Sequence, residues 1–202
     1  LEQLATESGH RIVWRVGTQN RQDAEDPAFL RLADVIIEFS RPEAAFHNVM
    51  TCLNARVPVI CGTTGWSARF EEAATFCQQQ RGALLWASNF SIGVHIFFAL
   101  NRYFTSVMNA YPFYQPSVTG IHHARKLDMP SGTAITLAEH IIAASNQKKR
   151  WELGHEEKSP DILPIDAIRQ GDVTGTHTAR WEGPYDSISL THEAHSRNGF
   201  AA

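Results

Sequence analysis

The chain has 202 residues, of which 43% are hydrophobic and 19% charged, and its formal net charge is -3. This balance is typical of a globular protein of one or two domains, because disordered chains carry fewer apolar residues and more net charge. No window is apolar enough to cross a membrane: even residues 84–100 are interrupted by Ser88, Asn89 and His95. The composition therefore excludes a membrane-spanning protein.

Apart from Lys148-Lys149-Arg150, interpreted as a solvated helix end, the sequence has no basic stripe. A nucleic-acid binder is therefore not indicated. The 3 cysteines show no C-x-x-C spacing, so neither a disulfide framework nor a zinc ribbon is suggested. We expect free thiols and a reducing, cytoplasmic compartment.

The first half of the chain alternates strands and helices. The first residue is Leu1 rather than Met, and the apolar spacing predicts that the sequence begins inside a helix ending at Gly9, as a piece of a longer translation product. Strands are then predicted over 11–16, 35–39, 57–61 and 84–87, and helices over 27–33, 40–54 and 67–80, the last capped by Ser67. This order indicates a parallel sheet covered on both faces.

The second half reads differently. Helices are predicted over 92–108 and 131–145, and strands over 117–124, 162–169, 172–181 and 187–195. Strands that follow one another without helices between them indicate a mixed or antiparallel sheet. We therefore place a domain boundary near Phe90.

Two polar segments follow the third and fourth predicted strands, Gly62-Thr63-Thr64-Gly65 and Ala87-Ser88-Asn89-Phe90. The carboxyl edge of a parallel sheet is where ligands bind, and glycine lets backbone approach a phosphate or a flat ring. A tight turn without a ligand explains the first segment equally well, and Asn89 alone is a common loop residue.

The densest cluster of chemically active side chains lies over residues 121–134. His122, His123, Arg125 and Lys126 precede a helix start, whose free N–H groups suit a carboxylate. A histidine titrates near neutrality and a lysine supplies positive charge, which suits proton addition to an anionic substrate. Each residue alone reads as a cap or a surface charge; together they favour a site.

A metal site is the other hypothesis that histidines raise. His177, His192 and His195 are candidates, but His192 and His195 would diverge along an extended strand. We predict no metal.

The cluster also carries a family resemblance. His122-x-x-x-Lys126-x-Asp128-x-Pro130-Ser131-Gly132-Thr133-Ala134 resembles the signature of the dihydrodipicolinate reductase family of lysine and diaminopimelate biosynthesis. The similarity extends over nearly the whole chain, through 62–66, 89–94, 169–177 and 191–201.

The resemblance implies an α/β fold with a Rossmann-type parallel sheet domain over 1–90 and 198–202 and an α+β substrate and tetramerisation domain with a mixed sheet over 91–197. It implies NADPH or NADH as cofactor, a small dicarboxylate substrate and a homotetramer. His122 would be the acid and Lys126 its electrostatic partner. The substrate-binding residues would be His123, Ser131, Gly132 and Thr133. The cofactor-binding residues would be Gly62, Thr63, Thr64, Ala87, Ser88, Asn89 and Phe90.

The sequence departs from the family pattern in three places. The opening strand with its glycine fingerprint is absent, so we expect weak cofactor binding from this segment alone. Gly17-Thr18 stands where an acidic residue usually grips the ribose, which favours NADPH or dual use. Ser117 and Gly120 replace glutamates near the histidine pair. A non-catalytic carboxylate-binding or regulatory module and a reductase for another substrate are the alternatives.

Overall fold

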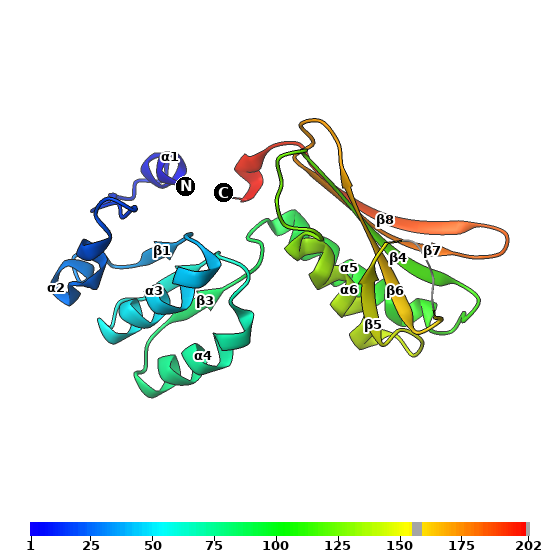
Figure 1. Ribbon diagram of the computed structural model, residues 1–202, viewed down its shortest axis with the longest axis horizontal. Helices are drawn as coiled ribbons and strands as arrows, with labels where there is room; N and C mark the ends of the chain where they lie inside the picture. Colours follow the sequence, from blue (N-terminus) through cyan, green and yellow to red (C-terminus); the bar gives the residue numbers. More distant parts are fainter. Residues whose placement is uncertain (155–158, 201–202) are drawn as a thin grey trace. The chain divides into compact units, whose positions relative to one another are not determined.

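The computed structural model describes residues 1–154 and 159–200. The chain falls into two compact units, residues 1–88 and 89–202, and each has its own sheet and core (Figure 1). The family-implied boundaries, including the return of residues 198–202 to the first domain, stay a prediction, and residues 201 and 202 lie outside the described part.

The first unit contains a three-stranded parallel sheet of order β1-β2-β3. The strands are β1 (Ile36–Glu38), β2 (Val59–Cys61) and β3 (Leu84–Trp86). Helices α3 (Pro42–Asn54) and α4 (Phe70–Gln79) lie on the same side of this sheet (Figure 1) and supply much of its core. The other face carries Ile37 and Leu85, which are 49% and 54% exposed. Only one face is thus well covered within the described residues, although burial of both was predicted.

The predicted strand over 11–16 does not form. Ile12, Val13 and Val16 are 37%, 40% and 40% exposed, and no described strand pairs with this segment. A segment rich in β-branched residues becomes a strand only where a neighbouring strand forms hydrogen bonds with its backbone N–H and C=O groups. Here the segment is held by local contacts instead: the Trp14 ring lies 5.0 Å from that of Phe29, and the Arg15 carbonyl accepts from Asn20 Nδ2 at 2.9 Å.

The remaining elements of this unit are short helices. They are α1 (Glu2–Glu7), η1 (Arg21–Glu25), α2 (Pro27–Leu30) and η2 (Ser67–Arg69). The cap predicted at Ser67 is wrong: Ser67 is the first residue of η2, and α4 starts after Arg69 without a side-chain cap. Asp26 does cap α2, accepting from the Ala28 N–H at 2.8 Å.

The second unit contains a five-stranded sheet of order β5-β6-β4-β7-β8. Its strands are β4 (Gln115–His122), β5 (Arg150–Leu153), β6 (Ile162–Arg169), β7 (Gly175–Glu182) and β8 (Ser187–Ala194). β6 runs parallel to β4 and β5, whereas β7 is antiparallel to β4 and β8, which confirms the mixed sheet.

Strand β5 was not predicted, because its basic start was taken for a helix end. Helix α6 ends at Ala144, and residues 148–150 lead into β5 instead. Lys148 is only 2% exposed, and its Nζ donates to the Pro160 carbonyl at 2.9 Å. The interpretation of this run as a solvated helix end is therefore wrong.

Helices α5 (Ile92–Met108) and α6 (Gly132–Ala144) cover one face of this sheet (Figure 1). Every second residue of β4 is buried, and the core includes Phe98, Leu137, Ile165 and Trp181. Ser131 caps α6 as predicted, since its Oγ accepts from the Ala134 N–H at 3.2 Å. This packing brings the start of α6 to the sheet.

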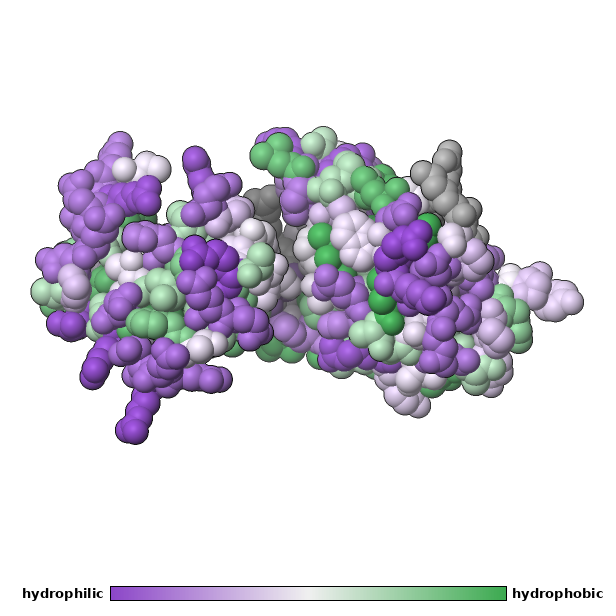
Figure 2. Space-filling model, turned by 60° about the horizontal axis from the view of Figure 1, so that its bottom comes forward, coloured by the Kyte–Doolittle hydropathy of each residue, from purple (hydrophilic) through white to green (hydrophobic). Residues whose placement is uncertain are grey.

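Two further expectations concern the whole described chain. All three cysteines are free, as predicted, and all three are buried. None of the helices in the described ranges is long and apolar enough to cross a membrane. On the surface seen in Figure 2, hydrophobic residues are scattered among hydrophilic ones.

Candidate active site

A pocket of about 220 Å³ lies at the carboxyl ends of β1 and β2 in the first unit. It is lined by Phe39, Ser40, Pro42, Gly62, Thr63 and Thr64. The predicted Gly62–Thr64 segment therefore lines a pocket, together with residues after β1 that sequence reasoning missed. A Cβ at Gly62 would lie 2.1 Å from the Phe39 ring, so the backbone and the ring approach in a way that only glycine permits.

A buried carboxylate holds this edge of the sheet together. Glu38 is 6% exposed, and its Oε1 accepts from the Ser40 N–H at 3.1 Å and from Asn48 Nδ2 at 3.2 Å. Cys61 donates to Oε2 at 3.1 Å, and the Ser40 N–H also reaches Thr63 Oγ1 at 2.8 Å. Burial raises the Glu38 pKa, but hydrogen bonds from the side chains of Ser40, Cys61, Thr63 and Asn48 outweigh it and leave the pKa lowered. Glu38 thus ties the end of β1 to the pocket segment.

In the second unit, His122 is the last residue of β4 and is 6% exposed. Its ring packs edge to face against that of His177, with centroids 4.8 Å apart. A Cβ at Gly175 would lie 3.4 Å from both Cδ2 and Nε2 of His122, so glycine leaves the space beside the imidazole open. Among the described residues, the buried Nδ1 of His122 has no hydrogen-bond partner.

The surroundings of His122 disfavour its charged form. Burial is the largest cause, followed by the positive charges of Lys126 and Arg169, while Asp128 acts in the opposite direction. Together with His123 they lower the pKa of His122 to about 4. An imidazole in this position gains a proton readily when negative charge arrives beside it.

The loop after β4 carries a close ion pair. Lys126 Nζ lies 2.7 Å from Asp128 Oδ1, and the two side chains are 25% and 54% exposed. Arg169, which stands opposite His122 in the β4–β6 register, donates to the carbonyl oxygens of Lys126 and Asp128. A strong cation is thus held close to the end of β4.

The start of α6 joins this group through His177. Ser131 Oγ lies 2.9 Å from His177 Nε2, and Thr133 Oγ1 accepts from Asn89 Nδ2 at 3.3 Å. The first N–H groups of the helix, at Gly132 and Thr133, precede the first intrahelical bonds and are available to an anion.

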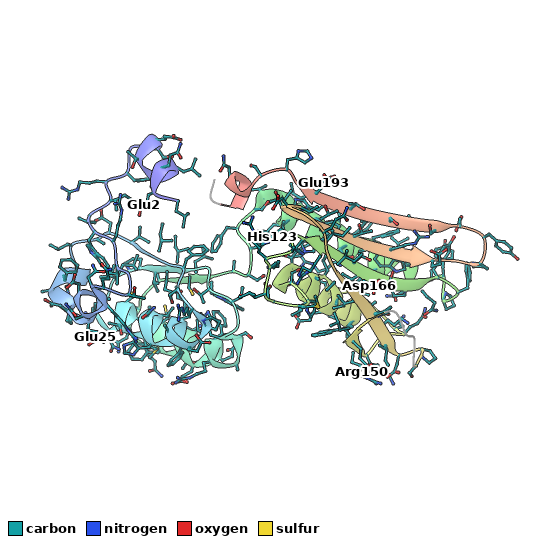
Figure 3. The ribbon with its side chains drawn as sticks, turned by 45° about the horizontal axis from the view of Figure 1, so that its top comes forward. Glu2, Glu25, His123, Arg150, Asp166 and Glu193 are labelled. Carbon is teal, nitrogen blue, oxygen red and sulfur yellow. The ribbon has the colours of Figure 1, made fainter. Side chains whose placement is uncertain are left out.

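The structure thus brings most of the predicted substrate residues together, whereas the predicted cofactor residues are divided between the two units. His122, Lys126, Ser131, Gly132 and Thr133 gather around the end of β4 and the start of α6. His123 follows the last residue of β4. It lies at the same end of the sheet as Glu193, whereas Arg150 lies at the other end (Figure 3). Of the predicted cofactor residues, Gly62–Thr64, Ala87 and Ser88 belong to the first unit, and Asn89 and Phe90 to the second.

Sequence reasoning singled out neither Arg169 nor His177 as a working part of the site. Both lie in the segment 169–177 that resembles the family, but His177 was otherwise considered only as a rejected metal ligand; it pairs with His192 across β7 and β8. His192 instead stacks on Phe97, with centroids 6.0 Å apart. Within residues 1–154 and 159–200, no group of three or more His, Cys, Asp or Glu side chains could hold a metal ion. The available signal in the sequence was position: Arg169 ends one predicted strand, and His177 lies within the next.

The two-unit architecture has counterparts among solved structures. The fold resembles a solved dihydrodipicolinate reductase from Paenisporosarcina sp. TG-14, described as dipicolinate bound, with a TM-score of 0.63, 23% identity and coverage of 99% of this chain and 76% of that one. It also resembles a probable dehydrogenase from Thermotoga maritima, with a TM-score of 0.52, 12% identity and coverage of 97% and 66%. At these identities the likeness concerns the fold alone.

The chain belongs to the dihydrodipicolinate reductase family. Residues 8–90 match the family model described as dihydrodipicolinate reductase, N-terminus, and residues 93–202 the model of its C-terminus. A 4-hydroxy-tetrahydrodipicolinate reductase from Christiangramia forsetii is 41% identical over 202 residues, which are 100% of this chain and 82% of that protein. One from Neisseria meningitidis serogroup C is 31% identical, covering 100% of this chain and 75% of that protein.

Proposed function

We propose that this protein reduces 4-hydroxy-tetrahydrodipicolinate to tetrahydrodipicolinate with NAD(P)H, in diaminopimelate and lysine biosynthesis; the 4-hydroxyl group leaves as water, and NAD(P)⁺ is the second product. The observation that carries the proposal is the convergence of a buried imidazole, a lysine and a helix N-terminus in the second unit. A dicarboxylate needs such positive potential, and its reduction needs a proton donor beside the accepted hydride.

In this proposal the start of α6 binds one carboxylate of the substrate. The N–H groups of Gly132 and Thr133 donate to it, and Ser131 keeps the helix start in place through its cap and its bond to His177. His123 contacts the substrate from the end of β4. The positive end of the helix dipole adds to this attraction.

His122 donates the proton to the carbon skeleton, and Lys126 stabilises the negative charge that develops. Because the pKa of His122 is about 4 without ligand, the imidazole acts as an acid only once substrate carboxylates raise that pKa. Lys126 must also exchange its bond to Asp128 for the substrate, which its partly exposed side chain allows.

The pocket of the first unit fits part of a nicotinamide cofactor. It is smaller than the roughly 300 Å³ at which drug-sized sites begin, so it would hold a ring or a phosphate rather than a dinucleotide. Gly62, Thr63 and Thr64, with Ala87, Ser88, Asn89 and Phe90, would hold the nicotinamide half. The bound cofactor supplies the hydride.

We propose NADPH or dual use, since Gly17-Thr18 offers no acidic side chain to a ribose.

We further propose a cytoplasmic homotetramer with the domain boundary near Phe90. The free cysteines are consistent with a reducing compartment. The dipicolinate named for the Paenisporosarcina structure supports a small dicarboxylate as ligand.

Steady-state kinetics of the full-length enzyme test the assignment of His122. His122→Ala should lower kcat by about 100- to 10,000-fold, the usual contribution of a placed general acid. His195→Ala, in an exposed position after β8, is the control. An unchanged kcat with a raised KM would make His122 a binding residue instead.

Binding of NADPH and of pyridine-2,6-dicarboxylate separates the enzyme from a non-catalytic module. The enzyme binds both and turns over the synthetic substrate; a module binds the analogue alone. Gly62→Ala should weaken cofactor binding without affecting the analogue, because the new Cβ displaces Phe39. Gly82→Ala, where the new Cβ would make only ordinary contacts of 3.4 Å or more ahead of β3, is the matched control.

A further inference from the structure

The tip of the loop between β4 and α6, residues 127–129, is exposed, whereas Pro130 behind it is buried. Leu127 is 97% exposed and Met129 50% exposed, and the Arg125 side chain is 84% exposed in its ion pair with Asp172. A loop whose side chains point into water is positioned by hydrogen bonds rather than by burial. Since this loop carries Lys126, its few anchors decide where the lysine lies.

Arg169 supplies two of these anchors from the end of β6. Its Nε donates to the Lys126 carbonyl at 3.1 Å, and its Nη2 donates to the Asp128 carbonyl at 2.5 Å. The two acceptors flank the exposed Leu127, so one guanidinium grips the loop on both sides of its tip. No carboxylate of the described residues forms a salt bridge with Arg169. Its Nη1 donates to the Ile168 carbonyl at 3.3 Å, so all three guanidinium nitrogens bond to carbonyl oxygens.

Backbone hydrogen bonds hold the end of β6, which carries Arg169, against the end of β4. The Gln170 N–H donates to the His122 carbonyl at 2.8 Å, and the Ala124 N–H donates to the Gly171 carbonyl at 3.0 Å. These bonds continue the pairing of β4 and β6, in which Arg169 stands opposite His122. The guanidinium therefore relates Lys126 to the strand that carries His122.

We propose that Arg169 is a positioning residue for Lys126: it clamps residues 126–128 so that the ammonium group stays beside His122 during turnover. The inference rests on the proposed function, because it concerns the same reaction. Only arginine suits the task, since its planar fork reaches two carbonyl oxygens at once, whereas a lysine ammonium is a single point on a flexible stem. The competing role, direct binding of a substrate carboxylate, makes different kinetic predictions.

A double-mutant cycle between Arg169 and Lys126 distinguishes the two roles. In the full-length enzyme, Arg169→Gln should lower kcat by about 100-fold, as expected when a reacting group is misplaced by about 1 Å, with little change in KM. Arg169→Lys should restore less than a tenth of the loss. In a Lys126→Ala background, Arg169→Gln should change kcat by less than about twofold, because the group it positions is gone.

Arg180→Gln is the matched control, since Arg180 lies on β7 and its Nε pairs with Glu182 at 2.6 Å. It should leave kcat and KM unchanged. Additive losses in the cycle, or a raised KM with an unchanged kcat, would overturn the positioning role and make Arg169 a substrate ligand.

Amide hydrogen exchange gives a readout that needs no turnover. In Arg169→Lys, exchange at residues 125–129 should speed up at least tenfold relative to the wild type, while exchange in β4 and β6 stays constant. Unchanged exchange at residues 125–129 would contradict the positioning role of Arg169. This test remains available even if Arg169→Gln fails to fold. Absence of turnover in the wild type would instead contradict the proposed function, and the exchange measurement would still test Arg169.

Discussion

The imidazole rings of His122 and His177 pack edge to face, with centroids 4.8 Å apart and planes at 67°. Both side chains are buried, one at the end of β4 and the other in β7. Ser131 Oγ accepts from the Ala134 N–H and lies 2.9 Å from His177 Nε2, a contact that either neutral tautomer of His177 can satisfy. Burial lowers the pKa of both rings, to about 4 for His122 and about 3 for His177, so the pair is neutral at pH 7 in the absence of ligand.

This neutrality predicts acid sensitivity of the fold. Burial, and then the charges of His122 and its neighbours, lower the pKa of His177 to about 3, against 6.5 for the free side chain. Between these values the unfolded chain binds more protons than the native one, so the free energy of unfolding is fully retained above pH 6.5 and falls as pH decreases towards 3. The slope is at most about 1.4 kcal/mol per pH unit for one histidine.

Urea unfolding at a series of pH values measures this slope. His177→Gln should flatten it between pH 6.5 and 4, because glutamine does not titrate. His195→Gln, with an exposed side chain, should leave it unchanged. A slope that is the same in His177→Gln as in the wild type would contradict the prediction.

Binding of a dicarboxylate should be accompanied by uptake of a proton at His122. His122 is neutral at pH 7 because its pKa is about 4, and a bound dicarboxylate favours the imidazolium form. Affinity for pyridine-2,6-dicarboxylate should therefore increase as pH falls from 7 towards 4. Calorimetry in two buffers of different ionisation enthalpy should show uptake of up to about one proton. His122→Gln should reduce the uptake and His195→Gln should not; equal uptake in both variants would place the proton elsewhere.

Ser131 should be worth more than an ordinary helix cap. Ser131→Ala removes the bond to the Ala134 N–H and the bond to His177, so unfolding should become easier by about 2 kcal/mol. Ser91→Ala is matched, because Ser91 caps α5 through the Val94 N–H, and its hydroxyl group has no second hydrogen-bond partner among the described residues; about 1 kcal/mol is expected there. Chemical denaturation compares them, and equal losses would show that the His177 bond contributes nothing.

Glu38 should be a structural carboxylate of the first unit. In Glu38→Gln an amide NH₂ replaces an oxygen that accepts from Ser40, Asn48 or Cys61. Donor then meets donor in a buried place, which should cost about 1–3 kcal/mol. Glu182→Gln, which breaks an exposed ion pair with Arg180, should cost less than about 1 kcal/mol. Thermal unfolding compares the two, and a neutral Glu38→Gln would refute the role.

Much of this protein can be predicted from its sequence, because the relevant signals are local. The periodicity of α5, the cap at Ser131 and the alternation along β4 each arise within a few residues. The substrate cluster could be found for the same reason: it lies in one continuous stretch from His122 to Thr133.

What only the tertiary structure decided depends on partners distant in the chain. The segment 11–16 has the composition of a strand, but no strand of the described residues pairs with it. Lys148 can be buried because its ammonium group donates a hydrogen bond to the Pro160 carbonyl. Arg169 and His177 reach the site from β6 and β7, over separations at which a sequence shows no periodicity. Local propensity selects helices and strands, but only long-range pairing decides which side chains meet, since the hydrogen bonds that hold Lys126 and Ser131 come from other strands of the sheet.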